Sequence, residues 1–516
     1  MKKFLFIATI FIFCIGLCCN KAIPDNDLWA RLIAGQSIVD NYTILKQDFL
    51  SYTPTHAWYD HEWGASAIIY AAFKYFGDAG LILLKGILAA LTVLFCYKAV
   101  AVRNKDINPC NIFYYLIMYL AAVKSMGNVV RCLMFTSFFF AVSLYILESA
   151  RAGNKKKLFL LPLIMIFWSN IHGGCISLLG LLGIYTIGEF LNKSSYKEYI
   201  YCLLGCLASL FINPYGFEYV KFLFYAATMD RGYITEWISS FNPYFVHRYI
   251  FYKVYLIVFL IIPVIYFIKE KLNYTKIDKT KYLLFIIMAY LSIMHVRHQA
   301  LFALTAGVFM YEEFYSVVNT VIYALRQKFK IENKEFIREF CLFKDVAIYS
   351  LALFIAFPLF ISHKEIRISE TVYPIYMIEF VKINDIKGNL FINFDWGSYA
   401  AYKLYPNNLI VMDGRYEEVY NPELLTTLYN FHKVRDNWDK IIKDYKTDVM
   451  ILETKYPVYE KIKKSDDWKL VFANELYGVF VPSNTVRENY KYPPIEDEYY
   501  NSTKFNTDIF KINKKA

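Results

Sequence analysis

Residues 249–268 read YIFYKVYLIVFLIIPVIYFI, a stretch whose only charged side chain is Lys253. A helix of this length and apolarity can cross the hydrocarbon core of a bilayer. Comparable apolar stretches recur along the chain and predict roughly eleven membrane spans. They lie at Phe4–Cys19, Ala79–Val102, Ile112–Val123, Cys132–Leu147, Leu158–Trp168, Ile176–Leu191, Tyr199–Ile212, Tyr249–Ile268, Tyr282–Met294, Ala300–Met310 and Val346–Ile361. The sequence therefore predicts a polytopic α-helical membrane protein.

The composition and the placement of charge support this class. The chain is 57% hydrophobic and 19% aromatic over 516 residues, which is too apolar for a soluble protein. Its net charge of +11 comes from Lys and Arg in alternate short loops, such as Lys155 to Lys157 and Lys269 to Lys281. This pattern predicts a multi-pass protein of the inner (plasma) membrane with a cytoplasmic N-terminus, and it does not indicate a nucleic-acid partner.

The composition changes at Ser362, and from there to residue 484 short apolar strands alternate with amphipathic helices. We expect strands at Asn389–Phe394, Leu409–Met412, Val449–Leu452, Lys469–Ala473 and Gly478–Val481, and helices at Gly397–Tyr405, Pro422–Asn430 and Trp438–Asp444. This alternation predicts a small α/β domain. An odd number of spans after a cytoplasmic N-terminus predicts that this α/β domain lies on the extracytoplasmic side of the membrane. Residues 485–516 are expected to form a poorly ordered tail.

Residues 1–361 are expected to form the membrane domain, with a large first outer loop over residues 22–77. In that loop Asp27 is placed to cap a short amphipathic helix, Leu28 to Ala34, which Gly35 would end. A second apolar helix, Gly64 to Phe76, is bounded by Gly77 and is too short to span the bilayer comfortably, so we expect it in the interface. All ten cysteines lie at or before Cys341, so the α/β domain folds without disulfides.

Polar residues gather in the predicted outer loops, opposite the loops rich in Lys and Arg. They include Asp25 and Asp27, His61 and Glu62, Arg131, His172, Asn213, Glu236 with Trp237, and Arg297 with His298. A channel needs polar residues through the depth of the bilayer, whereas a collection at one face indicates chemistry on a substrate presented there. We therefore predict an extracytoplasmic site.

Asp25 and Asp27 follow the first span, where a carboxylate can act as a general base toward an acceptor hydroxyl. The alternative is that Asp27 caps a helix and Asp25 is solvated. His61 and Glu62 lie among aromatic residues and could contact a phosphate or hydroxyl, or anchor the loop at the interface. One His beside one carboxylate is weak evidence for a metal site, so no metal ligand is assigned, although a divalent cation stays open.

Four further residues are candidates for binding a phosphate. Arg297 and His298 form a basic turn between two apolar stretches, and Arg131 lies in another outer loop; each could bind a lipid-linked phosphate or extend to the interface as an anchor. His172 precedes Gly173 and Gly174, which permit a tight turn, and a packing role is the alternative. In the α/β domain, Asp413-Gly414-Arg415 is interpreted as a turn tied by a local salt bridge.

These motifs resemble a branch of the C-type glycosyltransferase superfamily, which includes protein O-mannosyltransferases, oligosaccharyltransferases and lipid A aminoarabinose transferases. The resemblance covers most of the chain and rests on several short motifs. They are Asp25-Asn26-Asp27-Leu28-Trp29, Asp48 to Thr53, Trp58 with His61-Glu62-Trp63, Asn170 to Gly174, Asn213 to Gly216, Glu236-Trp237, Asp395-Trp396-Gly397 and Asp413-Gly414-Arg415.

The resemblance implies that an acidic residue after the first span is the catalytic base or a metal ligand, a place matched by Asp25 and Asp27. It also implies a sugar donor linked to a polyprenyl phosphate, held by basic residues, and a histidine late in the loop, matched by His61. The chain departs from the look-alike family at Arg31, where a His is usual, and from O-mannosyltransferases at Glu62-Trp63, which replace a Pro pair.

Two functions follow as hypotheses. The first is an integral-membrane glycosyltransferase that moves a sugar from a polyprenyl-phosphate donor to an extracytoplasmic lipid, glycan or protein. Its partners would be the lipid-linked donor and membrane lipid, while protein partners, the donor sugar and the acceptor are not predicted. The second is a non-enzymatic carrier or assembly factor for envelope polysaccharide. Neither GxGxxG nor GxxxxGK[ST] occurs, so nucleotide binding is not indicated.

Overall fold

The computed structural model describes residues 2–19, 23–126, 129–229, 231–232, 234–271, 277–329, 346–347, 349–356, 365–493 and 499–501. The chain divides into two compact units. The first, called here the helical unit, consists of Met1–Asn20 and Ile82–Lys364. The second, the α/β unit, consists of Lys21–Leu81 and Glu365–Ala516, so the first loop groups with the C-terminal region.

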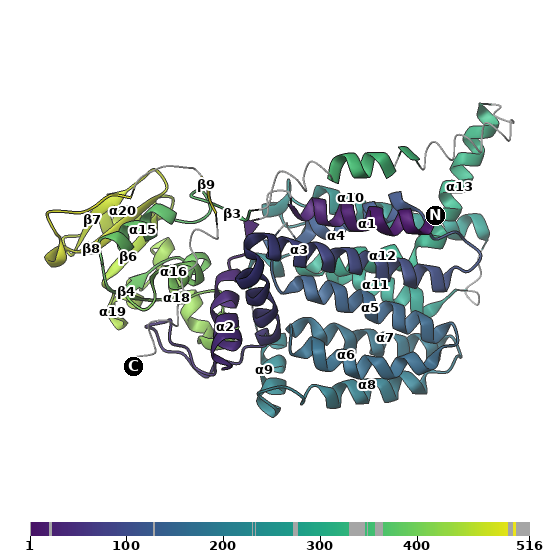
Figure 1. The fold of residues 1–516 in the computed structure, drawn as a ribbon, viewed down its shortest axis with the longest axis horizontal. Helices are drawn as coiled ribbons and strands as arrows, with labels where there is room; N and C mark the ends of the chain where they lie inside the picture. The colour runs from purple at the N-terminus through teal and green to yellow at the C-terminus, as the bar shows by residue number, and fades with distance from the viewer. Residues whose placement is uncertain are drawn as a thin grey trace. The chain divides into compact units, whose positions relative to one another are not determined.

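The helical unit is a bundle whose long helices run side by side (Figure 1). Its helices are α1 (Lys2–Cys19), the later part of α3 (Trp63–Arg103), α4 (Ile112–Met126), α5 (Leu133–Arg151), α6 (Leu160–Ser169), α7 (Ile176–Leu191), α8 (Lys197–Ser209), α9 (Phe217–Thr228), α10 (Ile250–Glu270), α11 (Lys279–Met294), α12 (Gln299–Phe309) and α13 (Tyr311–Lys328). Each apolar stretch predicted from the sequence, up to Ala300–Met310, falls on one of these helices. Part of the last, Val346–Ile361, lies outside the described residues.

The predicted number of spans is not confirmed. Among the described residues, four helices are long and apolar enough to cross a membrane, or up to five if α12 and α13, which are bent by 65° at their junction, count as one span. Two further apolar helices, Lys3–Cys19 and Ile112–Ala122, are shorter. Several predicted spans are too short because polar loops interrupt the apolar sequence, and these helices do not reach the usual length of about 20 residues.

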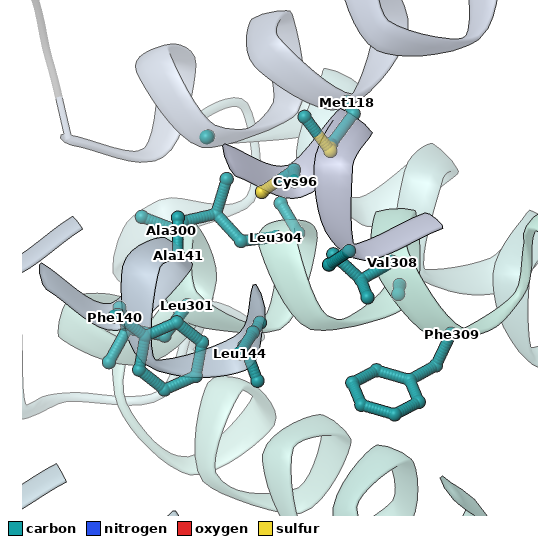
Figure 2. Close-up of a cluster of buried hydrophobic side chains, with 14 of the residues drawn as sticks. Cys96, Met118, Phe140, Ala141, Leu144, Ala300, Leu301, Leu304, Val308 and Phe309 are labelled. Atoms are coloured by element: carbon teal, nitrogen blue, oxygen red, sulfur yellow. The ribbon is translucent and has the colours of Figure 1, made fainter. Parts of the chain in front are cut away.

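Helix α12 is the centre of the bundle, because every residue from Gln299 to Phe309 is buried. A helix that is apolar on all sides is expected in the interior of a bundle rather than on its surface. Figure 2 shows Leu301 and Leu304 of α12 among side chains from neighbouring helices, including Phe140 of α5 and Met118 of α4. Close packing here uses small residues: a Cβ added to Gly307 would lie 2.3 Å from the Met118 sulfur.

Ionic side chains occupy both ends of this bundle, so polar clusters are not confined to the predicted outer loops. At the last turn of α5, Arg151 binds Glu189 at 2.8 Å and Asp278 at 2.8 Å, while Glu148 pairs with Arg103. Arg131 precedes the same helix and therefore marks the opposite end. Local sequence carries no sign of this network, because its basic members look like ordinary loop charges and its acids lie in three separate segments.

The α/β unit is built on a five-stranded mixed sheet of order β5-β4-β6-β8-β7. Its strands are β4 (Gly388–Phe391), β5 (Asn408–Ile410), β6 (Val449–Glu453), β7 (Trp468–Ala473) and β8 (Tyr477–Pro482). Strand β4 runs parallel to both β5 and β6, and β8 runs antiparallel to β6 and β7. All five strands were predicted, because each is a short apolar run bounded by polar turn residues.

Helices connect and cover this sheet (Figure 1). They are α15 (Ile375–Ile383), α16 (Gly397–Leu404), α17 (Tyr416–Val419), α18 (Pro422–Lys433), α19 (Lys440–Asp444) and α20 (Pro457–Lys463). Helices α15, α17 and α20 were not predicted, and the last two are only four and seven residues long. Of the predicted tail, residues 485–493 and 499–501 are described, and β9 (Tyr499–Asn501) pairs with β3 (Arg367–Ser369). The rest of the tail lies outside the described residues.

The first loop adds to this sheet instead of standing apart from it. Ser51 forms a parallel bridge with Ile410 of β5, and Tyr52 donates its backbone N–H to the Ile410 carbonyl at 3.0 Å. Thr55 bridges to Tyr420 farther along. The loop therefore covers the outer edge of the sheet at β5, where an uncovered strand would leave backbone groups unpaired.

The helices of the loop differ from the prediction at one of two glycines. Helix α2 (Leu28–Asn41) does not end at Gly35 but continues to Asn41. Gly35 is instead a packing position, since a Cβ there would lie 2.1 Å from the Ser66 carbonyl oxygen on α3. At Gly77 the expected boundary is present: its φ of 60° and ψ of −149° break α3 into two helical parts.

We expect Gly35→Ala to destabilise the chain by about 1–3 kcal/mol, because the added methyl group meets backbone that cannot rotate away. The matched control is Gly180→Ala in α7, where nothing lies within 4 Å of the added Cβ. That control should be neutral or slightly stabilising, since alanine favours a helix over glycine. Thermal unfolding midpoints of the two purified variants would test this, and equal midpoints would contradict the close contact.

Candidate functional site

The eight predicted site residues divide between the two units. Asp25, Asp27, His61 and Glu62 lie in the α/β unit, all on the first loop. The predicted phosphate-binding residues, Arg131, His172, Arg297 and His298, lie in the helical unit. The structure thus gives two separate candidate groups of residues, one within each compact unit.

Asp25 and Asp27 form a turn that leads into α2. The Asp27 backbone N–H donates to Asp25 Oδ1 at 3.1 Å. Asp27 is at the N-cap position of α2, but its side chain makes no capping hydrogen bond. Instead a Cβ added to Gly414 would lie 2.1 Å from Asp27 Oδ1, so the carboxylate rests on the Gly414 backbone. Asp27 therefore occupies the predicted N-cap position, but its side chain does not supply the capping hydrogen bond.

One turn farther along α2, Arg31 is buried at the centre of a group of carboxylates. Its Nη1 lies 2.5 Å from Asp60 Oδ1, its Nη2 lies 3.1 Å from Glu418 Oε2, and its Nε lies 3.4 Å from Glu62 Oε2. Burial raises the pKa of Asp60 to about 6, although the charge of Arg31 opposes that shift. The planar guanidinium suits such a site because its donors point in several fixed directions.

His61 lies against the same carboxylates. Its Nδ1 is 3.1 Å from Glu418 Oε1, and its Nε2 is 3.8 Å from Glu62 and 4.0 Å from Glu417. Burial alone lowers the pKa of His61, but the hydrogen bond to Glu418 and the three negative charges outweigh it and raise the pKa to about 9. The imidazole is therefore a cation at neutral pH, and Trp58 Nε1 adds a 2.6 Å hydrogen bond to Glu418.

We call Arg31, Asp60, His61, Glu62 and Glu418 the carboxylate cage. It holds three carboxylates against one guanidinium and one imidazolium, with Glu417 at its edge, so negative charge is in excess. Burial raises the pKa of Glu418, yet the charges of Arg31 and His61 outweigh burial and lower it to about 2. An excess of buried negative charge favours a cation or a proton donor at this place.

Three members of the cage could hold a metal ion. Ligand atoms of His61, Glu62 and Glu418 all lie within 4.8 Å of one another. One nitrogen and two carboxylate oxygens suit a divalent transition metal such as zinc. However, Arg31 already binds Glu62 and Glu418, and His61 would have to lose its proton to become a ligand. The donor set thus fits a metal only after deprotonation of His61.

A second buried arginine fixes the turn beneath Asp27. Arg415 Nε lies 2.9 Å from Asp413 Oδ1, and its Nη1 lies 2.6 Å from Asp48 Oδ1. The guanidinium also stacks over the Trp58 ring at 4.6 Å. Asp413-Gly414-Arg415 is therefore a turn tied by a local salt bridge, as interpreted from the sequence, and the partner from the first loop is Asp48.

In the helical unit, Arg131 pairs with Glu236, one contact being 3.3 Å between Nη2 and Oε2. Burial raises the pKa of Glu236, but the charges of Arg131 and then Arg297 outweigh it and lower the pKa. Arg131 therefore already has a carboxylate partner, and a phosphate bound there would share it with Glu236.

Trp237, next to Glu236, organises the remaining basic residues. Arg231 lies 4.6 Å and Arg297 5.3 Å from the Trp237 ring centre, which is cation–π range. The rings of His295 and His298 lie 5.5 and 6.2 Å from the same ring, and His295 Nδ1 is 2.7 Å from the Trp237 carbonyl oxygen. Arg297 is thus held over an aromatic face near a cluster of basic groups.

His172 has a different environment from Arg297. Its Nδ1 accepts the Gly174 backbone N–H at 2.8 Å and lies 2.9 Å from Thr136 Oγ1, which in turn accepts a hydrogen bond from Trp168 at 3.1 Å. These contacts occupy Nδ1 with structural partners and agree with the packing alternative. A phosphate-binding role for His172 stays an untested prediction.

Sequence reasoning missed four members of the site: Arg31, Asp60, Glu417 and Glu418. Arg31 stands out in the sequence only as a departure from a family pattern, although a charged residue four positions after Asp27 on an apolar helix signals a buried partner. The adjacent Glu417 and Glu418 follow the Asp-Gly-Arg turn closely, but nothing local to them indicates a partner on the first loop. That pairing spans 387 residues between Arg31 and Glu418.

No protein-family model matches the chain, and no curated protein matches it in sequence. Solved structures are similar in fold. The oligosaccharyltransferase of Archaeoglobus fulgidus in its apo form matches with a TM-score of 0.58 at 10% identity, over 87% of this chain and 69% of that one. Its complex with Zn and sulfate matches with a TM-score of 0.53 at 10% identity, over 86% and 68%. ArnT from Cupriavidus metallidurans bound to undecaprenyl phosphate gives a TM-score of 0.48 at 12% identity, over 92% and 97%.

Oligosaccharyltransferases are among the members of the superfamily that the sequence motifs resemble. The likeness in structure agrees with that resemblance at the level of the fold: the chain shares the fold of the Archaeoglobus fulgidus oligosaccharyltransferase, with a helical unit and a smaller unit that contains a sheet. An identity of 10% shows the fold alone.

The raised pKa of His61 predicts how stability depends on pH. Below pH 6.5 histidine is protonated in both folded and unfolded chains and the stabilisation is complete; it is lost as the pH rises through about 9, where folded His61 titrates. We expect the free energy of unfolding to fall by up to about 3 kcal/mol between pH 6.5 and 9. The thermal unfolding midpoint should fall over the same pH range. His61→Gln should reduce that fall.

The matched control is His56→Gln, because His56 is an exposed histidine on the same loop. In this variant the unfolding midpoint should depend on pH as it does in the unaltered chain. The midpoint at each pH is measured by tryptophan fluorescence on heating. An equal fall in His61→Gln and in the unaltered chain would show that His61 does not carry the effect.

Proposed function

We propose that the chain is an integral-membrane glycosyltransferase that moves a sugar from a polyprenyl-phosphate donor to a lipid, glycan or protein acceptor on the extracytoplasmic side. The observation that carries this proposal is the packing of Asp27 and the carboxylate cage around one turn, Asp413-Gly414-Arg415 with α17, in a chain of this fold. A base needs a fixed position, and buried ion pairs on both sides of the turn supply one.

In this mechanism Asp25 or Asp27 accepts the proton of the acceptor hydroxyl. The hydroxyl oxygen forms a bond to the anomeric carbon of the sugar as the bond from that carbon to the phosphate oxygen breaks. The polyprenyl phosphate leaves with the electron pair, and the proton remains on the aspartate until it passes to water. General-base assistance of this kind contributes about 100-fold to 10,000-fold in rate.

The leaving phosphate gains negative charge, so cationic groups that face it stabilise the transition state. Arg297 and Arg131 are the proposed cations. His298 lies beside Arg297, but burial and then the charge of Arg297 lower its pKa to about 4, so it would contribute as a neutral hydrogen-bonding group. Arg297 is the stronger candidate of the two arginines, because Arg131 already pairs with Glu236. A guanidinium can bind two phosphate oxygens at once, which an ammonium cannot do.

A divalent cation, if the chain uses one, would be held by His61, Glu62 and Glu418. The oligosaccharyltransferase of similar fold has been crystallised with Zn and sulfate, which supports testing zinc first. Such an ion would polarise an oxygen of the bound substrate. The chain's own contribution there is the cage, which keeps two carboxylates close to the imidazole.

Replacement of the proposed base gives the direct test. Asp25→Asn or Asp27→Asn keeps size and most hydrogen bonds but removes the proton acceptor, so one of the two should lower transfer by about 100-fold or more. The measurement is the level of lipid-linked and surface glycans in cells that express each variant in place of the unaltered chain. Asp385→Asn is the control, because Asp385 is an exposed aspartate of the same unit with a φ of 47° that Asn also tolerates.

Full complementation by both single variants and by the double variant would remove Asp25 and Asp27 from the chemistry. It would also favour the alternative of a non-enzymatic carrier or assembly factor for envelope polysaccharide. If a lipid-linked sugar donor accumulates in cells that lack the chain, the enzyme is favoured, because its substrate is no longer consumed. Loss of a carrier or assembly factor should instead cause its polysaccharide to accumulate.

The role of Arg297 is tested by a graded pair of substitutions. Arg297→Lys should lower turnover, since Lys keeps the charge but loses the paired donors and the planar contact with Trp237. Arg297→Gln should lower it further. If Arg297 only anchors the chain at the interface, the Lys variant should be silent. Arg248→Gln is the control, because Arg248 also lies over an aromatic ring, that of Tyr244, at 5.6 Å.

A further inference from the structure

The order of strands in the α/β unit creates a reversal point in its sheet. From β4 the chain crosses to β5 on one side, then returns past β4 to form β6 on the other side, with both neighbours parallel to β4. The connections after β4 and β6 therefore diverge at the carboxyl ends of these strands. In α/β sheets, ligands bind in the crevice that such a divergence opens.

Polar side chains occupy this place. Asn393 and Asp395 follow β4, Glu453 ends β6, and Lys455 and Tyr456 come next. Asn393 Nδ2 donates to Glu453 Oε1 at 3.0 Å across the two strand ends, and Lys455 pairs with Glu453. Asp395 and Lys455 are exposed, while Glu453 is 7% exposed. We call these five residues the switch-point cluster.

The first loop reaches the same cluster. Asn26 hydrogen-bonds to Asp395, and the Asn26 amide oxygen accepts the Tyr373 hydroxyl at 2.8 Å. Asn26 stands between Asp25 and Asp27 in the sequence. A ligand bound at the cluster would consequently lie beside the segment that carries the proposed base.

A buried histidine next to the cluster points to a ligand independently of these charges. His432 on α18 is only 7% exposed, and neither of its ring nitrogens has a hydrogen-bond partner among the described residues. Its ring lies 4.9 Å from that of Tyr456. A buried polar group without a partner is rare in native structures and costs about 1–3 kcal/mol. A bound molecule that supplies a hydrogen bond here would remove that cost, so the histidine favours a polar ligand.

The charges of the cluster select the ligand. Two ammonium groups, Lys455 and Lys433, lie 5.0 Å from the Tyr456 ring centre. Asp395 and Glu453, together with the charge of Asp25 that acts on Asp395, outweigh them, so the surroundings are net negative and repel phosphates and other anions. The cluster offers carboxylate and amide acceptors, amide and ammonium donors, and the half-buried ring of Tyr456, which His432, Lys433 and Lys455 also contact. Alternating donors and acceptors beside an aromatic ring match the hydroxyl groups and the apolar face of a sugar ring.

We propose that the switch-point cluster of Asn393, Asp395, Glu453, Lys455 and Tyr456 is a binding site for a carbohydrate without negative charge. The site gives the α/β unit a role of its own, which is to hold a sugar residue of the substrate next to the Asp25–Asp27 segment. This role rests on the proposed function, but binding at the site does not require turnover and is measured separately from transferase activity.

The experiment is saturation-transfer NMR on the full chain in detergent. The probes are methyl α-glucopyranoside, methyl α-mannopyranoside and methyl β-galactopyranoside, with methyl glucuronide as the anionic comparison. We expect at least one neutral glycoside to bind and methyl glucuronide to bind more weakly. Asp395→Asn and Glu453→Gln should each weaken binding by about tenfold, the usual effect of one hydrogen bond to a charged group.

The control is Glu460→Gln, which alters an exposed carboxylate on α20 of the same unit and should leave glycoside binding unchanged. If Glu453→Gln disturbs folding, Asp395→Asn decides, because Asp395 is exposed. The proposal is overturned if no neutral glycoside binds, if Asp395→Asn binds as tightly as the unaltered chain, or if methyl glucuronide binds more tightly than the neutral probes. A chain that binds glycosides but transfers no sugar would sustain this site and contradict the transferase.

Discussion

The α/β unit depends on two buried guanidinium groups. Arg31 brings Asp60 and Glu418 together, and Arg415 brings Asp48 and Asp413 together, so each arginine joins the first loop to the C-terminal region. Removal of one partner from a buried ion pair typically costs about 3–5 kcal/mol, because the other charge is left without compensation. The carboxylate cage is built around Arg31. The proposed base Asp27 contacts Gly414, which is the residue before Arg415.

This arrangement explains why the candidate base has a defined position although it lies on a loop. Asp27 rests on Gly414, and Gly414 is held by its neighbours Asp413 and Arg415. A loop residue normally samples several conformations, but here the ionic turn below it restricts the backbone. The same turn continues into α17, whose Glu418 closes the carboxylate cage. The same turn therefore fixes the position of Asp27 and supplies the Glu418 carboxylate of the cage.

Much of the fold was predictable from local sequence, and most of the site was not. The strands of the α/β unit and the apolar helices show themselves through periodicity within a few residues, as β6 does with Val449 to Leu452. Gly77 also marked its helix boundary correctly. By contrast, Gly35 looked like a helix end and is a packing position, because the signal for the contact lies on α3. Glu418 could not be assigned for the same reason: its partners Arg31 and His61 are distant in sequence.

In the helical unit, too, local sequence does not reveal which residues form ion pairs. Arg103 and Arg151 have the spacing expected of basic loop residues, and that property alone predicted their place relative to the bilayer. Their carboxylate partners, Glu148, Glu189 and Asp278, come from separate segments and form a network only when α5, α7 and α11 pack together. Charge counts along a sequence thus locate basic residues better than they identify what those residues bind.

The two-segment construction of the α/β unit has a consequence for biogenesis. Arg31 and Glu418 are separated by 387 residues, so at usual synthesis rates the loop waits roughly 20 to 80 s for its partner. During that interval Arg31 faces Asp60 and Glu62 alone, without the C-terminal residues that later help to bury Arg31 and Asp60. The first loop must therefore stay soluble and unassembled while the whole helical unit is made. A chain released before the C-terminal region is made would have a first loop in which Arg31 lacks its partner Glu418. Cellular quality control would encounter the chain with this loop unassembled.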